Sequence, residues 1–420
     1  MHEGPLSSII LTRQAVPLVR RGTPEYRAIT VGMLLGGFAT FLQLYCLQSI
    51  LPTLSEEFHV TPATSSYVVS AATMSLAVGL LLTSFLSDLL SRRRLMSLSL
   101  LASSVFTIAA AWSPNFSILV AFCGLKGFAL SGLPAIAMAY LSEEIEPLSL
   151  GQIMGLYIGG NILGGMMGRV VTALLTGWIS WRFALGSIGV VCFIMGVVFL
   201  RILPASRHFH PRRPSAAKLW RQVRGHMSDP VLLELFAFIG LMMGSFISVY
   251  NYLGFRLKAA PFFLSNSFVG AIFSMYLVGF FGSYLSGAMA DRMGRRSLLW
   301  MLVILTLVGL WLMLANSLWV VIGGLALFTF GFFGSHSVAS SWIGRRALHA
   351  RAIASALYLF FYYVGSSVLG SATGVVLRQK GWAGVVEVLS VAIFVSLCLS
   401  LLLRKTKKRA TPPEIAVASS

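Results

Sequence analysis

The chain has 420 residues, of which 57% are hydrophobic and 11% are charged, and its formal net charge is +19. Soluble domains carry about 25% charged residues, so this composition, with a mean hydropathy of +0.83, excludes a soluble globular protein. The charge would suit a nucleic-acid-binding protein, and the positions of the basic residues decide that question.

Apolar stretches of about 20 residues, long enough to cross a hydrocarbon core of about 30 Å, recur along the chain. They cover residues 28–51, 64–86, 95–112, 116–141, 152–176, 183–203, 231–253, 264–290, 298–315, 318–342, 352–377 and 384–403. Backbone groups must be paired within lipid, so each stretch is predicted to be a helix. We therefore predict an all-α membrane protein with twelve transmembrane helices in two six-helix bundles.

The basic residues lie mainly on one side of the predicted helices. With the N-terminus in the cytoplasm, 25 Lys and Arg residues fall in cytoplasmic segments and 5 fall on the other side. This bias follows the positive-inside rule and places both termini in the cytoplasm. No soluble basic domain with stacking aromatics remains, so a nucleic-acid partner is excluded.

The polar segments divide the chain into five parts. We predict a cytoplasmic N-terminal tail (1–27), a six-helix half (28–203), a basic linker (204–230), a second six-helix half (231–403) and a cytoplasmic C-terminal tail (404–420). Residues 1–27 lack a signal-peptide core. The four cysteines fall singly within predicted helices and are expected to be buried free thiols, without a metal site.

Polar side chains within the first half are candidates for a substrate or proton site. The stretch 28–51 offers Gln43 and Gln48 but no acid, and Lys126 and Arg169 lie at similar depths in later stretches. Ionisable groups in a membrane are costly and usually face a cavity or a partner. We predict a basic cavity that binds an anionic group, or a proton on Lys126. The alternative is that Arg169 extends to the interface and Lys126 bonds backbone carbonyls.

Two polar interruptions, SFLSDLLSRR at 84–93 and GAMADRMGRR at 287–296, separate apolar stretches. Asp88 and Asp291 are each predicted to face the N-terminus of a helix in the opposite half, near residues 352 and 152, where the helix dipole favours an anion. Arginines of these turns are predicted to pair with Glu143 and Glu144, and such contacts would hold one gate closed. The alternative for the arginines is a role as membrane anchors. The other members of this predicted gate are Arg92, Arg93, Gly287, Arg292, Gly294, Arg295 and Arg296.

The second half carries its own candidates. Glu234 lies in the first turn of the stretch 231–253, near an interface. His336 is the sole histidine within the predicted helices, and its pKa range suits proton transfer, with side-chain packing as the alternative. Tyr250 belongs to a dense set of aromatic residues that either pack in the core or line a pocket for an apolar substrate.

The two halves align as a repeat. At an offset of 201, Leu156-Tyr157 matches Leu357-Tyr358, Gly164 matches Gly365, Thr172 matches Thr373 and Trp181 matches Trp382, while Asp88 and Asp291 match at 203. We infer that one six-helix unit is used twice, as two parallel halves joined by the basic linker.

The second interruption resembles the signature G-x-L-A-D-R-x-G-R-K-x-x-L of the major facilitator superfamily, through Gly287, Ala290, Asp291, Arg292, Gly294, Arg295, Arg296 and Leu299. The first copy departs from it, with Ser84 and Ser91 in place of glycines. The phrases YLSEEI, SRHF and HSVASSWIG resemble the YnfM-type bacterial inner-membrane transport proteins, a group regarded as efflux permeases.

The resemblance implies a secondary transporter of the bacterial inner membrane that works by alternating access. We expect proton-coupled efflux of a small organic molecule, with proton-linked uptake of an organic anion or a sugar-like solute as the alternative. The expected partners are the substrate, protons and the bilayer, and the chain is expected to be a monomer. We expect no cofactor and no enzymatic activity.

Two signatures of family members that export substrates are incomplete in this chain. The segment GLYIGGNILGGMMGR (155–169) resembles the glycine-rich antiporter signature, but Asn161 replaces its proline. Its glycines give small faces for close helix packing whether or not the protein is an antiporter. In the stretch 116–141, the usual arginine of R-x-x-Q-G is absent, and Lys126 appears three residues later, on the same helical face.

Overall fold

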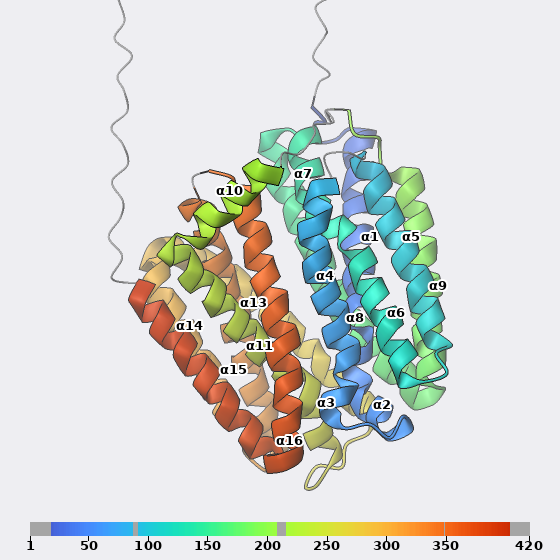
Figure 1. Ribbon diagram of the computed structural model, residues 1–420, viewed down its shortest axis with the longest axis vertical. Helices are drawn as coiled ribbons and strands as arrows, with labels where there is room; N and C mark the ends of the chain where they lie inside the picture. Colours follow the sequence, from blue (N-terminus) through green and yellow to red (C-terminus); the bar gives the residue numbers. More distant parts are fainter. Residues whose placement is uncertain (1–17, 87–90, 208–215, 348, 404–420) are drawn as a thin grey trace, which may run out of the picture.

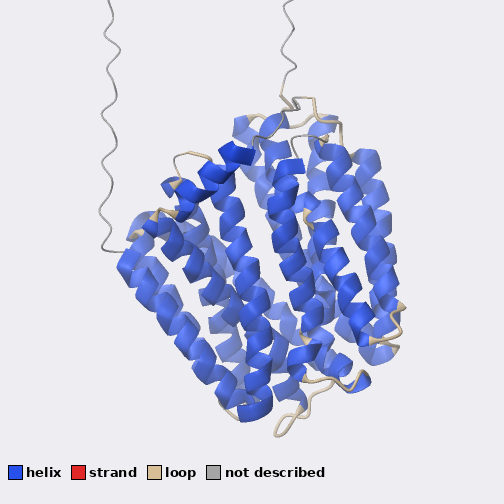
Figure 2. Cartoon of the chain, in the orientation of Figure 1, coloured by secondary structure: helices blue, strands red, loops and turns tan. Residues whose placement is uncertain are grey.

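The computed structural model describes residues 18–86, 91–207, 216–347 and 349–403. Within these ranges the chain is helical and contains no strand, apart from one bridge between Val19 and Ile145 (Figure 2). Lipid offers no hydrogen-bond partners to backbone N–H and C=O groups, whereas a helix pairs these groups within itself. The apolar stretches are therefore helical. The predicted fold class, an all-α membrane protein, is confirmed.

The first half contains six spans, several of them interrupted. In chain order they are α1 (Pro24–Tyr45) with η1 (Cys46–Ile50) and α2 (Leu51–Glu57); α3 (Pro62–Ser65) with α4 (Tyr67–Leu86); α5 (Arg92–Ala111); α6 (Phe116–Leu130) with α7 (Gly132–Glu144); α8 (Pro147–Trp178); and α9 (Trp181–Ile202).

The second half contains α11 (Pro230–Lys258), then α12 (Asn266–Ala271), η2 (Ile272–Met275) and α13 (Tyr276–Met293) as one span, then α14 (Arg295–Leu312), α15 (Leu318–Arg346) and α16 (Arg351–Leu403). The 53 residues of α16 are interrupted at Gly381, whose φ of 64° and ψ of −163° are not helical. Positive φ is tolerated by glycine because it has no Cβ. The break divides α16 into two spans, so the described chain has the twelve spans that the sequence predicts.

The spans form two bundles that pack in equivalent ways (Figure 1). In the first, α1 packs along α8; in the second, α11 packs along the first part of α16. A Cβ added at Gly164 would lie 2.1 Å from the carbonyl oxygen of Phe38, and one added at Gly365 would lie 1.9 Å from that of Gly240. Glycine therefore permits the same close helix crossing at both of the positions that the repeat aligns.

The two bundles are joined near one end, which we call the lower end because it lies at the bottom of Figure 1; it carries the turns at 58–61, 112–115 and 259–265. There α3 and α4 pack on α16, and α12 packs on α8. The hydroxyl of Thr73 lies 2.8 Å from that of Ser367, and the hydroxyls of Ser70 and Ser371 are 2.7 Å apart. An ion pair at 3.0 Å joins Lys258 to Glu56.

One feature adds to the sequence-based expectations and another differs from them. The predicted linker contains a helix, α10 (Ala216–Met227), whose His226 ring lies 3.3 Å from the carbonyl oxygen of Ala350. Cys46, Cys123 and Cys192 are buried free thiols as expected, but Cys398 is exposed. The expectation for Cys398 was wrong because a lipid-facing surface is as apolar as the protein interior, so hydropathy cannot separate the two.

Candidate functional site

The first span is interrupted where the candidate site lies. Pro52 stands in the first turn of α2 and has no N–H, so the carbonyl of Gln48, four residues earlier, lacks its α-helical donor. The 3₁₀ turn η1 replaces the α-helix there. This turn presents Cys46, Gln48 and Ser49 to residues of neighbouring helices.

Arg169 of α8 is the largest fully buried side chain and is 1% exposed. Its Nε donates to Gln48 Oε1 at 2.7 Å, and its Nη1 donates to the carbonyl oxygen of Gly165 at 2.5 Å. The guanidinium carbon lies 4.2 Å from the ring centroid of Tyr45 and 4.4 Å from that of Tyr276, distances at which cation–π attraction is effective. Tyr45 belongs to the first half and Tyr276 to the second, so the arginine contacts both halves.

A hydrogen-bonded chain continues from Arg169 across the interface. Gln48 Nε2 donates to Asn251 Oδ1 at 2.7 Å, and Asn251 Nδ2 donates to the carbonyl oxygen of Gly370 at 3.2 Å. Gln48 and Asn251 are 203 residues apart, the offset that also relates Asp88 to Asp291. The two amides therefore occupy equivalent positions of the repeat. Asn251 is not among the candidates predicted from the sequence, although this offset would have identified it.

The glycines of α8 bring Arg169 close to the first span. Added Cβ atoms at Gly160, Gly164 and Gly168 would lie 2.7, 2.1 and 2.4 Å from backbone oxygens of α1. Asn161 lies beside this contact, and its Oδ1 is buried without a hydrogen-bond partner among the described residues. Close packing is thus one role of this glycine-rich segment, and the part of Asn161 in substrate binding stays a prediction.

Lys126 occupies a separate site within the first half. It is 1% exposed, and its Nζ lies 4.0 Å from Cys46 Sγ. Gln43 is hydrogen-bonded to other groups: its Nε2 donates to the carbonyl oxygen of Ala39, and its Oε1 accepts from Thr107 Oγ1 at 2.9 Å. The structure therefore places Lys126 against Cys46 and Arg169 against Gln48, with no partner shared between the two cations in the described chain.

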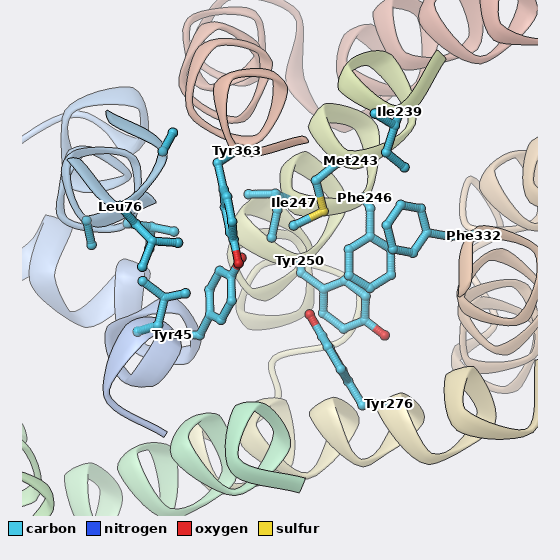
Figure 3. Packing of buried hydrophobic residues seen from close by; sticks show 14 of the residues in the cluster. Tyr45, Leu76, Ile239, Met243, Phe246, Ile247, Tyr250, Tyr276, Phe332 and Tyr363 are labelled. Atoms are coloured by element: carbon cyan, nitrogen blue, oxygen red, sulfur yellow. The ribbon is translucent and has the colours of Figure 1, made fainter. Parts of the chain in front are cut away.

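Aromatic side chains of the second half pack around Tyr276, whose ring contacts Arg169. Figure 3 shows Phe246, Tyr250, Tyr276 and Phe332 of this group. The rings of Phe246 and Phe332 are stacked with centroids 4.0 Å apart, and the Tyr250 hydroxyl lies 2.8 Å from Thr329 Oγ1. The Phe246 ring also contacts that of Tyr276. Tyr250 is thus a buried core residue with a satisfied hydroxyl.

The two other second-half candidates form no hydrogen bond with Gln48 or Arg169 within the described ranges. His336 is half-buried, and its Nδ1 lies 2.9 Å from the Tyr358 hydroxyl. Its ring stacks on Phe332 and Tyr358. Glu234, in the first turns of α11, is partly buried, and its Oε2 has no hydrogen-bond partner within the described ranges. Roles for both in proton transfer stay predictions.

The described gate residues lie where α5 begins, where α7 and α13 end, and where α14 begins, at the upper end of Figure 1. Arg92 forms an ion pair with Glu143 at 2.9 Å, a pairing that the sequence analysis named. Glu144 accepts from Ser206 Oγ and from the backbone N–H of Arg207, and its pairing with an arginine of these turns stays a prediction. Arg93 donates from Nη2 to the carbonyl oxygen of Leu200 at 2.5 Å.

The second copy of the motif spans the end of α13 and the start of α14. Gly294 has a φ of 82°, which explains the glycine, whereas an added Cβ at Gly287 would meet nothing closer than 3.8 Å. Arg295 Nε donates to Ser341 Oγ at 3.3 Å, Arg296 lies over the Trp342 ring, and Arg292 is exposed. Asp88 and the side chain of Asp291 lie outside the described parts of the chain, so their contacts with opposing helix starts stay predictions.

Comparisons with known proteins agree with this architecture. The family model of the Major Facilitator Superfamily matches residues 33–279 and 259–419. The chain is 46% identical over 390 residues to the uncharacterized MFS-type transporter YybF of Bacillus subtilis, covering 93% of this chain and 96% of that protein. It is 41% identical over 387 residues to the inner membrane transport protein YnfM of Escherichia coli, covering 92% and 93%.

Solved structures with the same fold include a bacterial homologue of the human lysosomal transporter Spinster, in an inward-facing and occupied conformation. The TM-score is 0.77 at 13% identity, with 92% of this chain and 98% of that chain covered. At this identity the likeness shows the fold alone. The family-model match and the full-length relatives together show that this chain belongs to the Major Facilitator Superfamily of transporters.

Proposed function

We propose that this transporter exports a small organic molecule in exchange for protons across a bacterial inner membrane. Family membership supports secondary transport by alternating access, in which the two halves rock around a central site. The observation that carries the proposal is the hydrogen-bonded chain from Arg169 through Gln48 to Asn251, because it joins the halves at the position where substrate or protons would act.

The distribution of basic residues supports the orientation. The upper end carries the arginine-rich turns and is assigned to the cytoplasm by the positive-inside rule. The lower end then faces outward, and the hydroxyl contacts between α4 and α16 close the protein to the outside. Because these are neutral hydrogen bonds, each worth about 1 kcal/mol, they can break when the protein opens outward.

A second candidate function is proton-linked uptake of a small organic anion or a sugar-like solute. The observation that favours an anion is the guanidinium of Arg169, whose hydrogen bonds and ring contacts among the described residues involve only neutral groups. A buried charge without a counterion is costly. Lys126, with a thiol as its neighbour, is the candidate proton carrier for either direction.

Flux in oriented membrane vesicles separates the two functions. A panel of labelled organic acids, sugars and hydrophobic amines is offered to inverted and right-side-out vesicles, each with and without an imposed pH gradient. Export by antiport predicts uptake into inverted vesicles with an acidic lumen, abolished by nigericin. Symport predicts uptake into right-side-out vesicles from an acidic medium. Flux that ignores the pH gradient in both preparations would refute proton coupling.

A further inference from the structure

One guanidinium nitrogen of Arg169 has no hydrogen-bond acceptor among the described residues. Its Nε and Nη1 donate to Gln48 and Gly165, but Nη2 has no acceptor among the described residues. Nor does any described carboxylate form an ion pair with it. Taking a cation out of water costs several kcal/mol, and neutral amide and carbonyl acceptors recover only part of that. The site therefore holds one positive charge that remains to be neutralised.

A second unused donor lies beside it. The Tyr45 ring covers the guanidinium at 4.2 Å, Tyr45 is 4% exposed, and its hydroxyl is buried with no hydrogen-bond partner within the described chain. A buried hydroxyl normally has a partner, so an orphaned one requires an explanation. Figure 3 shows Tyr45 and Tyr363, from opposite halves, pointing toward one another. The donor on Tyr45 thus lies where the halves meet.

The surroundings restrict the charge and body of a ligand. Phe273 and Tyr276 also lie against the guanidinium, at 5.7 and 4.4 Å from their centroids. Lys126, which is buried to the same extent as Arg169, contacts Cys46 instead. The single unneutralised cation can balance one negative charge on a ligand. A second carboxylate on the ligand would lose its hydration without gaining a cationic partner.

We propose that Arg169 and Tyr45 recognise a small organic monocarboxylate with an apolar body. One carboxylate oxygen accepts from Arg169 Nη2 and the other from the Tyr45 hydroxyl, a charge-assisted pair of hydrogen bonds. The apolar body packs against the tyrosine and phenylalanine rings around the guanidinium. This inference rests on the proposed transport function and names the substrate class of the same site.

Ligand binding to the purified full-length protein tests the proposal without requiring flux. Benzoate, cyclohexanecarboxylate and octanoate are compared with benzamide, which lacks the charge, and with phthalate, which carries two, by calorimetry and thermal unfolding. All three monocarboxylates are expected to bind and raise the unfolding temperature. Benzamide and phthalate are expected to bind at least tenfold more weakly than benzoate. If none of the monocarboxylates binds, or if benzamide binds as tightly as benzoate, the proposal is wrong. The proposed transport function is tested independently by flux in vesicles.

Variants locate the site. Arg169→Gln is expected to abolish benzoate binding, and Tyr45→Phe, which keeps the ring, to weaken it about tenfold, equivalent to about 1.4 kcal/mol. Arg182→Gln, which removes a surface arginine of the same half, is expected to leave binding unchanged. Arg169→Lys keeps the charge and the fold if Arg169→Gln proves unstable, and it should bind more weakly than wild type. Loss of binding in Lys126→Gln with normal binding in both Arg169 variants would overturn the assignment.

Discussion

The close crossing of α1 and α8 makes a quantitative prediction at Gly164. An alanine there would put its Cβ 2.1 Å from the carbonyl oxygen of Phe38, and the obstacle is backbone, which a rotamer change cannot move. Overpacking by one methyl group costs about 3 kcal/mol at the upper end of its usual range. The higher helix propensity of alanine stabilises the folded state by about 1 kcal/mol relative to glycine. The free energy of unfolding should therefore fall by about 2 kcal/mol.

The chain provides a matched control and a symmetry test. Gly155 lies on the same helix, and an added Cβ there would meet nothing within 4 Å, so Gly155→Ala should be neutral or stabilising by up to about 1 kcal/mol. Gly365→Ala should destabilise as Gly164→Ala does, because its Cβ would lie 1.9 Å from the Gly240 oxygen. Equilibrium unfolding in detergent measures all three. Equal stability of Gly164→Ala and Gly155→Ala would refute the crossing.

Three further predictions concern charges. Asp291→Asn should slow vesicle flux at least tenfold while leaving the unfolding temperature within about 2 °C, because the predicted gate contact needs the carboxylate charge and asparagine keeps the size of the side chain; an unchanged flux would contradict the predicted gate. A double-mutant cycle of Arg92→Gln and Glu143→Gln should show a coupling energy of about 1 kcal/mol in unfolding, since the pair at 2.9 Å is partly buried; a coupling near zero would count against it. Gln48→Glu should place a carboxylate 2.7 Å from Arg169 Nε. The new ion pair should raise the free energy of unfolding, and it should abolish benzoate binding because the charge of Arg169 is then neutralised. A variant that still binds benzoate would argue against a single unneutralised charge.

The number and type of elements could be predicted from the sequence because lipid leaves the chain little choice. An apolar stretch such as 183–203 must be a helix of about the length of the bilayer thickness, and α9 (Trp181–Ile202) agrees with it closely. The repeat was equally visible, since residues such as Gly164 and Gly365 serve the same packing contact. Features that depend on composition and spacing, such as the spans and the repeat, could therefore be predicted from the sequence.

The rotation of each helix about its own axis was the part that could not be predicted. A membrane helix is apolar on all sides, so periodicity does not show which face is buried. Depth alone placed Lys126 and Arg169 at one level and suggested a shared cavity, whereas they contact Cys46 and Gln48 respectively. The interruption that separates the two contacts did have a signal, Pro52, which the analysis of apolar stretches did not use.

The symmetry of the repeat sharpens the case for Arg169. At the offset of 201 that relates α8 to the first part of α16, its counterpart is Gly370. Gln48 therefore bonds an arginine side chain, while its equivalent Asn251 bonds the backbone oxygen of Gly370. The amide that must reach a side chain is the longer of the two, and the one that reaches a backbone oxygen is the shorter.

A network of two equivalent amides would suffice to join two equivalent halves. The arginine is the member that the duplicated architecture does not require, and its buried charge costs folding free energy that the glycine at position 370 does not. Alternating access depends on what the halves share, whereas recognition of an asymmetric substrate depends on where they differ. Arg169 is such a difference at the centre of the interface, so substrate recognition gives a reason for its presence.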